Sequence, residues 1–537
     1  MLVWTLAACG GREERPPAAR EVPAPAPVRA RPTGPVSTIA PGDYIGPDAC
    51  GECHPEQLAQ WTTSLHRVMN QPAGAAAVIG DFDDAVVPYA GGEARFQRDG
   101  GVYTMTLADR ERTVRYRVTR TIGRRALQEY VGIADGDTEE VRLPFGWWPR
   151  RGGWYPQPYF DPWLGEEDFD AYARVREPWA ERCPWCHSTY PFAQRIVRAA
   201  VRDVGHGLEQ HFDAPAGSDA TMPASPADHL ATARQVTIGI SCESCHLGGR
   251  AHQGGAAMTF VPQGAPPRAG APEPRPFADE RRDPAIVNTV CAQCHSGPSP
   301  RLADGTALRN SSEALDLAAS PCTQARCTDC HDPHTGGSDE QRALAACTGC
   351  HATIAEAGRL HAGHDGVSCL DCHMPTIVMG VDRFVRTHRI SSPTDPRLLA
   401  AAAPNACNLC HLDRSIRWTV DELAREHEVA LDPGAWSAYG DLDLPVGEVW
   451  LASPEPAFRL IAGAAYARAA SRGLARFAWP ALMRGLADPL AHVRAWTAFA
   501  VEDVLGRRLT EAEYDPRLPA KQRARQLERL ARKPPGR

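Results

Sequence analysis

Eight copies of one five-residue pattern, Cys-x-x-Cys-His, carry most of the chemistry that this 537-residue sequence can do. Each copy places two thiols three residues apart and an imidazole directly after the second thiol. This is the attachment signal for c-type haem: the thiols add to the haem vinyl groups as thioethers, and the imidazole binds one face of the iron. The motifs are Cys50-Gly-Glu-Cys53-His54, Cys183-Pro-Trp-Cys186-His187, Cys242-Glu-Ser-Cys245-His246, Cys291-Ala-Gln-Cys294-His295, Cys327-Thr-Asp-Cys330-His331, Cys347-Thr-Gly-Cys350-His351, Cys369-Leu-Asp-Cys372-His373 and Cys407-Asn-Leu-Cys410-His411.

Three other uses of CxxC pairs are zinc knuckles, redox-active pairs and disulfides. Zinc has no need for a histidine directly after every pair, and only 19 of the 537 residues are histidine. Eight chance occurrences have odds of order 10⁻¹² by composition alone. The sequence therefore predicts eight covalently attached haem c groups, with the paired cysteines as haem-binding residues and the following histidines as iron ligands.

The start of the chain contains a candidate lipid-attachment site. Covalent haem attachment takes place outside the cytoplasmic membrane, so we expect the protein to be exported. Leu6-Ala7-Ala8-Cys9 looks like a lipobox, although only eight residues precede Cys9 and none of them is basic. A start codon assigned too late would explain this departure; the alternative is an apolar stub with an incidental cysteine. A lipid on Cys9 would hold the protein on a membrane in the periplasm or outer cell envelope without spanning it.

Patterns along the chain predict seven segments. Residues 10–43 are rich in Pro and Ala and lack periodicity, which is typical of a tether. Period-two runs after residue 95 predict antiparallel strands, and amphipathic stretches after His411 predict helices. The expected order is a signal or lipobox remnant (1–9), a linker (10–43), a first haem module (44–94), a β insert (95–150), a multihaem core with haems 2–8 (151–415), a helical cap (416–510) and a disordered tail (511–537).

The five motifs from Cys291 to His411 are closely spaced, at about 120 residues in all, too little polypeptide to surround each haem with its own core. We therefore expect a fold of helices and irregular chain around stacked haems. Leu486-Ala-Asp-Pro-Leu-Ala-His-Val-Arg494 resembles the turn of a HEAT repeat, which favours a helical repeat-like cap; a plain helical bundle is the alternative.

Several segments together resemble a known family. Tyr44-Ile-Gly-Pro-Asp-Ala-Cys50 with Trp61-Thr-Thr-Ser-Leu-His66 resembles the first module of cytochrome c-552/554-type multihaem proteins. Further segments look like the large multihaem cytochromes that end in TPR or HEAT-like repeats: these are Trp179–Thr189, Cys242–His252, Cys327–His334, Cys372–Pro375, Asp382–Ile390 and Pro404–Cys407. The resemblance implies an electron-transfer function for most members and a distant likeness to hydroxylamine oxidoreductase and multihaem nitrite reductases.

Eleven histidines lie outside the motifs and could supply the second axial ligands. The resemblance marks six of them as distal ligands: His66, His252, His334, His361, His364 and His388. His334 follows His331 by three residues, too near to reach the opposite face of the same iron, so we expect it to bind a neighbouring haem. A surface or core histidine is the alternative for each.

The remaining candidates are less informative. One or two of His206, His211 and His229 could reach an iron, and His427 and His492 are expected to be exposed on the C-terminal helices. Met222, Met374 and Met379 could also ligate, although Met374 belongs to the Cys-His-Met-Pro turn. Cys322 has no motif; a buried thiol is the first interpretation, and an unusual ligand or a regulatory thiol is the other.

Two functions remain open, an electron carrier and a haem oxidoreductase acting on small nitrogen or sulfur compounds. Bis-histidine ligation favours the carrier, whereas an open iron would permit catalysis. The related enzymes with a lysine on the catalytic iron are disfavoured because the two lysines, Lys521 and Lys533, both lie in the tail. A hydroxylamine-oxidoreductase-like site needs a tyrosine, and 12 are present.

Charge and hydropathy limit the partners. The net charge of −7 provides no basic field for nucleic acid, and no run of 18 apolar residues predicts a transmembrane helix. Propionates make the haem-loaded form more acidic still, so basic redox partner proteins are expected. The sequence does not identify the donor or the acceptor.

Overall fold

The computed structural model describes residues 37–89, 92–156, 178–192, 235–263, 275–297, 299–358, 361, 363–429, 433–516 and 518–534. The lipobox with Cys9, most of the predicted linker, and the candidates His206, His211, His229 and Met222 lie outside these residues.

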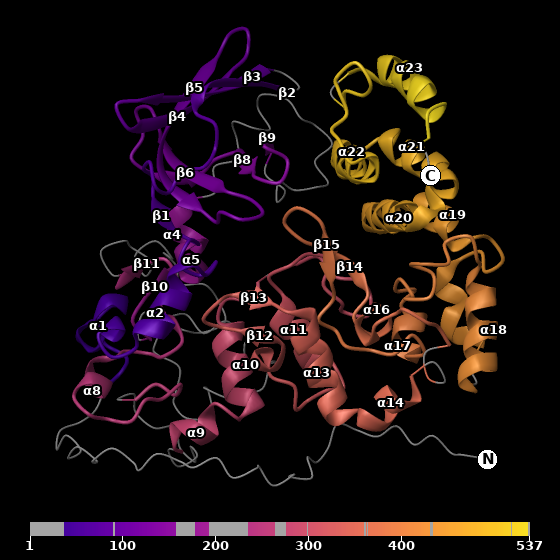
Figure 1. The fold of residues 1–537 in the computed structure, drawn as a ribbon. Helices are drawn as coiled ribbons and strands as arrows, with labels where there is room; N and C mark the ends of the chain where they lie inside the picture. The colour runs from indigo at the N-terminus through magenta and orange to yellow at the C-terminus, as the bar shows by residue number, and fades with distance from the viewer. Residues whose placement is uncertain are drawn as a thin grey trace.

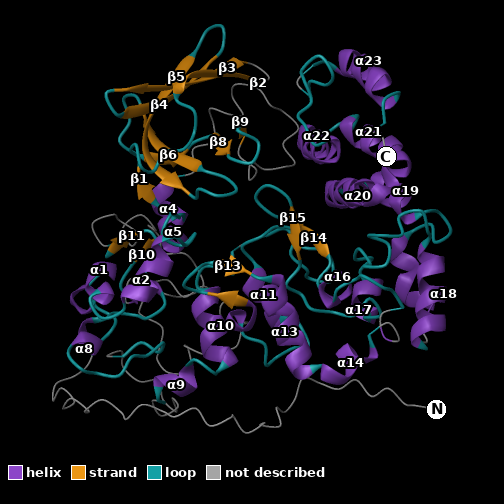
Figure 2. Ribbon diagram, in the orientation of Figure 1, coloured by secondary structure: helices purple, strands orange, loops and turns teal. Residues whose placement is uncertain are grey.

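An antiparallel sheet forms one layer of the molecule (Figures 1 and 2). Its strands follow chain order from β2 to β7, and β1 pairs with β5. In β4, Tyr103, Met105 and Leu107 alternate with more exposed neighbours or threonines and point into one apolar core, as the period of two requires. The strands are β1 (Gln71–Pro72), β2 (Asp83–Tyr89), β3 (Gly92–Asp99), β4 (Val102–Ala108), β5 (Thr113–Ile122), β6 (Glu129–Ala134) and β7 (Glu140–Arg142).

The predicted antiparallel sheet is therefore present, and it extends further toward the N-terminus than the strands predicted from residue 95. The sequence does not predict β2, because Pro88 and two aspartates interrupt the alternation of apolar residues there. It joins the sheet as an edge strand, the position that tolerates proline.

The hairpin β8 (Phe145–Trp148) and β9 (Gly153–Pro156) connects the sheet to the C-terminal helices. The Arg151 guanidinium donates to Glu502 Oε2 at 2.8 Å and lies 3.8 Å from the centre of the Phe499 ring. The Trp148 ring also lies 5.2 Å from that of Phe499. These contacts hold the hairpin against α22.

Where it is described, the motif-bearing region consists of short helices and pairs of strands two to four residues long, with much irregular chain between them. Figure 1 shows it as a row from α1 on the left to α17 on the right. Its elements are η1 (Pro41–Asp43), α1 (Pro47–Gly51), α2 (Pro55–Thr62), α4 (Trp179–Arg182), α5 (Pro184–His187), β10 (Ser188–Thr189), β11 (Thr237–Ile238), η4 (Cys242–Ser244), α8 (Arg250–Gln253), α9 (Phe277–Glu280), α10 (Pro284–Ala292), α11 (Glu313–Ala318), α12 (Cys327–Cys330), β12 (His331–Asp332), β13 (Gly337–Ser338), α13 (Glu340–Cys350), α14 (Ala352–Ala357), α16 (Cys369–His373), β14 (Thr376–Met379), β15 (Phe384–Arg386) and α17 (Pro396–Ala400).

A helical cap follows the last motif. Its core packs Ile461, Ala465, Leu482 and Val501 from successive helices with Trp479. Between α20 and α21 the chain kinks at Gly473, whose φ of 92° is the left-handed conformation that glycine adopts without strain. The elements are α18 (Ile416–His427), η5 (Pro433–Tyr439), α19 (Val446–Leu451), α20 (Pro456–Ala469), η6 (Ala470–Leu474), α21 (Ala475–Leu486), α22 (Ala491–Leu505) and α23 (Ala520–Ala531).

The turn that resembles a HEAT repeat is built around Asp488. Its carboxylate accepts hydrogen bonds from the Arg459 guanidinium at 2.7 Å and from the Leu490 amide at 2.9 Å. The Arg494 guanidinium donates to the Asp488 carbonyl at 2.9 Å. The helical region is thus observed, and its assignment as a repeat stays a prediction.

The prediction of a disordered tail over residues 511–537 is wrong, because α23 packs against α21. Trp479 Nε1 donates to the Leu530 carbonyl at 3.3 Å, and the Gln526 carboxamide bonds the Asp515 amide at 2.9 Å. The arginine-rich composition concealed an amphipathic helix: only a narrow stripe that includes Gln526 and Leu530 is buried.

Phe82 lies at the centre of the sheet core and provides a test of it. Its ring contacts Phe96, Tyr103, Tyr130 and Trp154 at centroid distances of 5.0–6.0 Å, and it is 3% exposed. Phe82→Ala should lower the free energy of unfolding by about 3–5 kcal/mol because it leaves a cavity among four rings. Urea unfolding followed by circular dichroism measures this loss.

The matched control is Phe477→Ala in the cap, since Phe477 is 40% exposed. It should change the free energy of unfolding by less than about 1 kcal/mol. Equal effects of the two substitutions would contradict the packing described here.

Candidate functional site

Each motif folds locally into a single helical turn, and this turn explains its spacing. The amide of the motif histidine donates to the carbonyl of the first cysteine, four residues earlier, at 2.9–3.0 Å in five motifs. Residues i, i+3 and i+4 of a helix lie on one face. The two thiols and the imidazole of a motif therefore project to the same side, as attachment of one planar group requires.

Histidines from outside the motifs lie opposite motif histidines. Five such pairs have ring centroids 6.0–6.5 Å apart, and four of the five are stacked within 19°. The pairs are His54 with His252, His246 with His334, His331 with His388, His373 with His361, and His411 with His364.

This separation fits a metal ion held between two imidazoles. A metal–nitrogen bond of about 2.0–2.1 Å on each side, with about 1.2 Å from nitrogen to ring centre, places two centroids at most roughly 6.4–6.6 Å apart. The tilt of 49° in the pair of His364 and His411 is compatible with this, because a ring can rotate about its own metal–nitrogen bond. Paired imidazoles beside two thiols are the donor set of bis-histidine haem c, so the residues present fit this group.

His66 is the sixth predicted distal ligand. Burial, followed by the charge of the nearby His295, lowers the pKa of His66. The His66 ring is hydrogen-bonded to the backbone of Pro333. The structure thus brings each of the six candidates close to a different motif histidine. No candidate of the six is left over for His187 or His351.

The tautomer of several rings is set by a backbone carbonyl. The Nδ1 atoms of His187, His252 and His373 lie 3.0, 2.9 and 2.8 Å from the carbonyl oxygens of Met69, Ala256 and Ser391. A proton on Nδ1 leaves Nε2 with a free lone pair, which is the form that binds a metal.

His295 differs, because its Nδ1 atom faces the carboxylate of Glu313 at 3.2 Å. Burial alone would lower the pKa of His295, but the hydrogen bond and charge of Glu313 outweigh it and raise this pKa to about 9. Burial alone would raise the pKa of Glu313. The hydrogen bond to His295 and the charge of His295 outweigh burial and lower the pKa of Glu313 to about 2. The sequence analysis missed Glu313, since no spacing relates it to the motif.

His246 has the most crowded surroundings of the paired rings. Burial, followed by the neighbouring His334, His252 and His54, lowers its pKa to about 4. Its imidazole is therefore neutral at physiological pH, as metal binding requires. The same contacts show that the pairs of the first and third motifs lie side by side.

Contacts between cysteines join the motifs to one another. The Cys50 and Cys242 thiols are hydrogen-bonded, as are those of Cys291 and Cys327. Electrostatic contacts between thiols continue the row: Cys245 with Cys291, Cys330 with Cys347, Cys347 with Cys369, and Cys372 with Cys407. The second motif joins the fourth, because Trp185 Nε1 donates to the Gln293 carbonyl at 2.7 Å.

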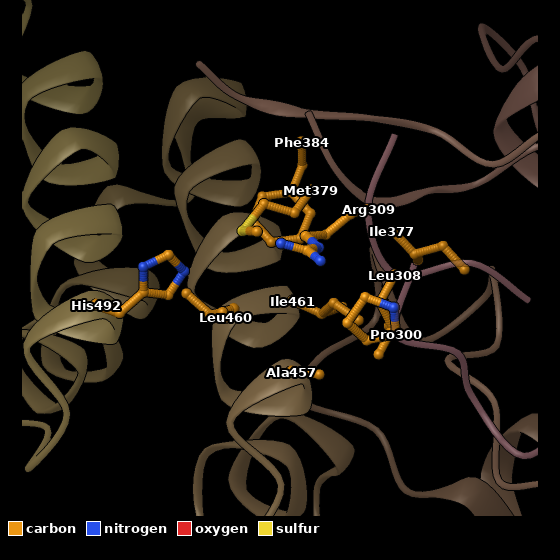
Figure 3. A pocket seen from close by; sticks show the side chains of 10 residues that line it. All are labelled: Pro300, Leu308, Arg309, Ile377, Met379, Phe384, Ala457, Leu460, Ile461 and His492. Carbon is orange, nitrogen blue, oxygen red and sulfur yellow. The ribbon is translucent and has the colours of Figure 1, made fainter. Parts of the chain in front are cut away.

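A small apolar pocket lies between β14 and the helices α20 and α22, away from the motifs (Figure 3). Its volume of about 20 Å³ holds little more than one water molecule. His492 points toward it, and burial lowers the pKa of this histidine to about 4. The prediction that His492 is exposed is wrong, because the adjacent β14–β15 segment covers this part of α22.

The other candidates lie as follows. Met379 lines the same pocket and is 4% exposed, whereas Met374 ends α16 directly after His373. His427 lies at the end of α18 with its ring 6.3 Å from that of His361. Cys322 is half-buried in the turn after α11.

Within the described residues, no helix has the length and apolar character to cross a membrane. Nor do three or more His, Cys, Asp or Glu side chains converge there into a group that would hold a metal ion. Five motif histidines of this part of the chain instead face one histidine each from outside the motifs.

Comparison with known proteins relates one part of the chain to a family. Residues 357–430 match the family model of cytochrome c552. This stretch contains the last two motifs together with His361, His364 and His388. The match supports covalent haem c attachment and a haem redox role. No curated protein matches the chain.

Two solved structures are similar over most of the chain. The outer cell wall cytochrome OcwA has 15% identity and a TM-score of 0.35, and the match covers 91% of this chain and 100% of that one. The octaheme sulfite reductase MccA of Wolinella succinogenes has 14% identity and a TM-score of 0.32, with coverages of 89% and 86%. Both TM-scores lie well below the value expected for a shared fold, so these likenesses do not establish one.

The pair of His246 and His334 leads to a test by substitution. With haem attached, His334→Ala should convert one low-spin ferric haem to high spin, because His246 then lacks the imidazole opposite it. Electron paramagnetic resonance of the oxidised protein counts the two spin states.

His492→Ala is the control, since His492 is partly buried but faces no motif histidine among the described residues. It should leave the spin count unchanged. A His334→Ala variant with an unaltered spectrum would show that His334 is not a ligand.

Proposed function

We propose that the protein is an octahaem c-type cytochrome that carries electrons between redox partner proteins. The observation that carries this proposal is the unbroken row of contacts from motif to motif, in which all eight take part. Haem c supplies an iron that cycles between the ferrous and ferric states. The paired cysteines would hold each haem, and the motif histidine would bind one face of each iron.

The second axial ligands would come from the facing histidines. His252, His334, His388, His361 and His364 would complete the first, third, fifth, seventh and eighth sites. His66 would complete the fourth. Two imidazoles leave no coordination position for a substrate, and this favours electron transfer over catalysis at these six sites.

The two ends of the row suit an exchange of electrons with partners. Cys53 of the first motif and Cys410 of the last are both exposed, as are Cys350 and Cys369 of the sixth and seventh motifs. Figure 1 shows α1 and α18, which adjoin these motifs, at opposite sides of the molecule. Electrons could thus enter near one end and leave near the other.

The proposed location is the periplasm or the outer cell envelope, since covalent haem attachment takes place outside the cytoplasmic membrane. A lipid on Cys9 would tether the protein through the segment before residue 37. With a net charge of −7 before the propionates are counted, basic partner proteins are the favoured donors and acceptors.

A haem oxidoreductase acting on small nitrogen or sulfur compounds is the second candidate function. Its specific support is that each of the six distal candidates lies near a motif histidine other than His187. His187 lies near the aromatic ring of Trp179, with its Nδ1 atom directed at the Met69 carbonyl. An open iron at this site would be a place for such chemistry.

Haem number gives a direct test of the proposal. The intact mass should exceed that of the polypeptide by eight haems of about 616 Da each, and denaturation should release none, because thioethers are covalent. Mass spectrometry of the denatured protein measures both. Bound zinc, or fewer than seven haems, would refute the proposal.

Carbon monoxide separates the two functions. The reduced protein should bind carbon monoxide at no more than two of eight haems, because the gas must displace a tethered imidazole at the other six. A titration followed by the Soret difference spectrum gives the number bound.

Turnover assays with nitrite, hydroxylamine and sulfite complete this test. If these compounds are oxidised or reduced only as slowly as by a simple bis-histidine cytochrome, the result supports the proposal that the protein is an electron carrier. Stoichiometric carbon monoxide binding at one site together with rapid turnover would establish the enzyme instead.

A further inference from the structure

In each facing pair, Nδ1 is the ring nitrogen that points away from the proposed iron site. Glu313 is a charged hydrogen-bond partner for this nitrogen in His295, whereas the partners described for the other rings are neutral or too distant. The Nδ1 atoms of His252 and His373 have neutral carbonyl partners, as does that of the motif histidine His187, for which no facing histidine is described. His334 has a carboxylate nearby, but its Nδ1 lies 3.9 Å from Asp332, beyond hydrogen-bonding distance. Among the described residues, the Nδ1 of His295 at 3.2 Å from Glu313 Oε2 is the one with a carboxylate in hydrogen-bonding contact.

The backbone fixes Glu313 beside His295. The amide of Ala314 donates to the His295 carbonyl at 3.0 Å, and the Ser312 hydroxyl donates to the Gly297 carbonyl at 2.6 Å. The other carboxylate oxygen, Glu313 Oε1, accepts from the Ser311 amide at 2.7 Å. The first turn of α11 is thus bound to the end of the fourth motif, and the carboxylate has little freedom to move away.

We propose that Glu313 lowers the reduction potential of the fourth haem below that of the haems whose ligands bond to backbone carbonyls. This proposal rests on the proposed haem function. A carboxylate that accepts the outer N–H of a ligand histidine makes the ring a stronger electron donor to the metal. Negative charge beside the site also stabilises the ferric over the ferrous iron, since the ferric site carries one more positive charge.

The fifth site should feel the same charge more weakly. His331 and His388 both lie within electrostatic reach of Glu313, although neither has a hydrogen bond to it. The fourth motif contacts the second, third and fifth, so it is a junction of the row. With a reduction potential below those of its neighbours, the fourth haem would be mostly oxidised. Electrons would pass through it from one neighbouring haem to the next without accumulating on it.

The test is spectroelectrochemical titration of the haem-loaded Glu313→Gln variant. Glutamine keeps the size of the side chain and a carbonyl acceptor but removes the charge. We expect the reduction potential of the fourth haem to rise by at least about 59 mV. For a one-electron couple this corresponds to a tenfold change in the equilibrium constant of reduction. The fifth haem should shift in the same direction by less.

Two further variants complete the design. Glu502→Gln removes a partly buried carboxylate that bonds Arg151, far from any motif histidine in sequence, and should leave all potentials unchanged. Glu313→Asp keeps the charge on a shorter side chain, so its shift should be smaller than that of the glutamine variant. It also serves as the measured variant if Glu313→Gln fails to fold.

The outcomes distinguish this proposal from the proposed function. Equal shifts in the aspartate and glutamine variants, or no shift with all eight haems present, would overturn the role of Glu313 and leave the electron carrier intact. A wild-type protein without eight haems would overturn the proposed function itself.

Discussion

The distance between facing imidazoles is the constraint on which the motif-bearing region depends. In most pairs the two histidines come from distant parts of the chain, such as His54 with His252 and His246 with His334. Each pair therefore brings together two segments that have little secondary structure of their own. The described parts of this region have short helices and strands of two to four residues, without the long ladders of hydrogen bonds that stabilise ordinary domains. The proposed metal–ligand bonds would supply much of the missing stabilisation.

The sheet and the helical cap have conventional cores, and they contact each other through the hairpin of β8 and β9. Arg151 combines an ion pair with Glu502 and a ring contact with Phe499, so this connection is both polar and apolar. A second ion pair joins Arg150 to Asp382 at 2.9 Å, in the segment between β14 and β15. The hairpin that packs against the sheet thus contacts both the cap and the segment between β14 and β15.

The sequence predicted what depends on neighbours along the chain. A CxxCH motif is one helical turn, so its pattern is visible in five consecutive letters, and the strands after Asp99 show their alternation as clearly. The family resemblance marked His334 as a distal ligand, and its short distance in sequence from His331 assigned it to another site. Contacts between distant segments were not predictable: Glu313 has no sequence signal, and burial of His492 depends on the segment around Met379. The helix α23 was missed because its buried stripe is narrow.

The order of the ligands along the chain has a consequence for assembly during export. A polypeptide is made from its N-terminus, and the partner of His54 in the first motif, His252, follows it by roughly 200 residues. The partners of His373 and His411, by contrast, precede the seventh motif and are present before it emerges. On the proposed ligand scheme, an interrupted chain would keep its early irons five-coordinate, whereas the last two would be complete as soon as they form. Exposure to reactive small molecules during biogenesis would therefore be concentrated in the first half of the protein.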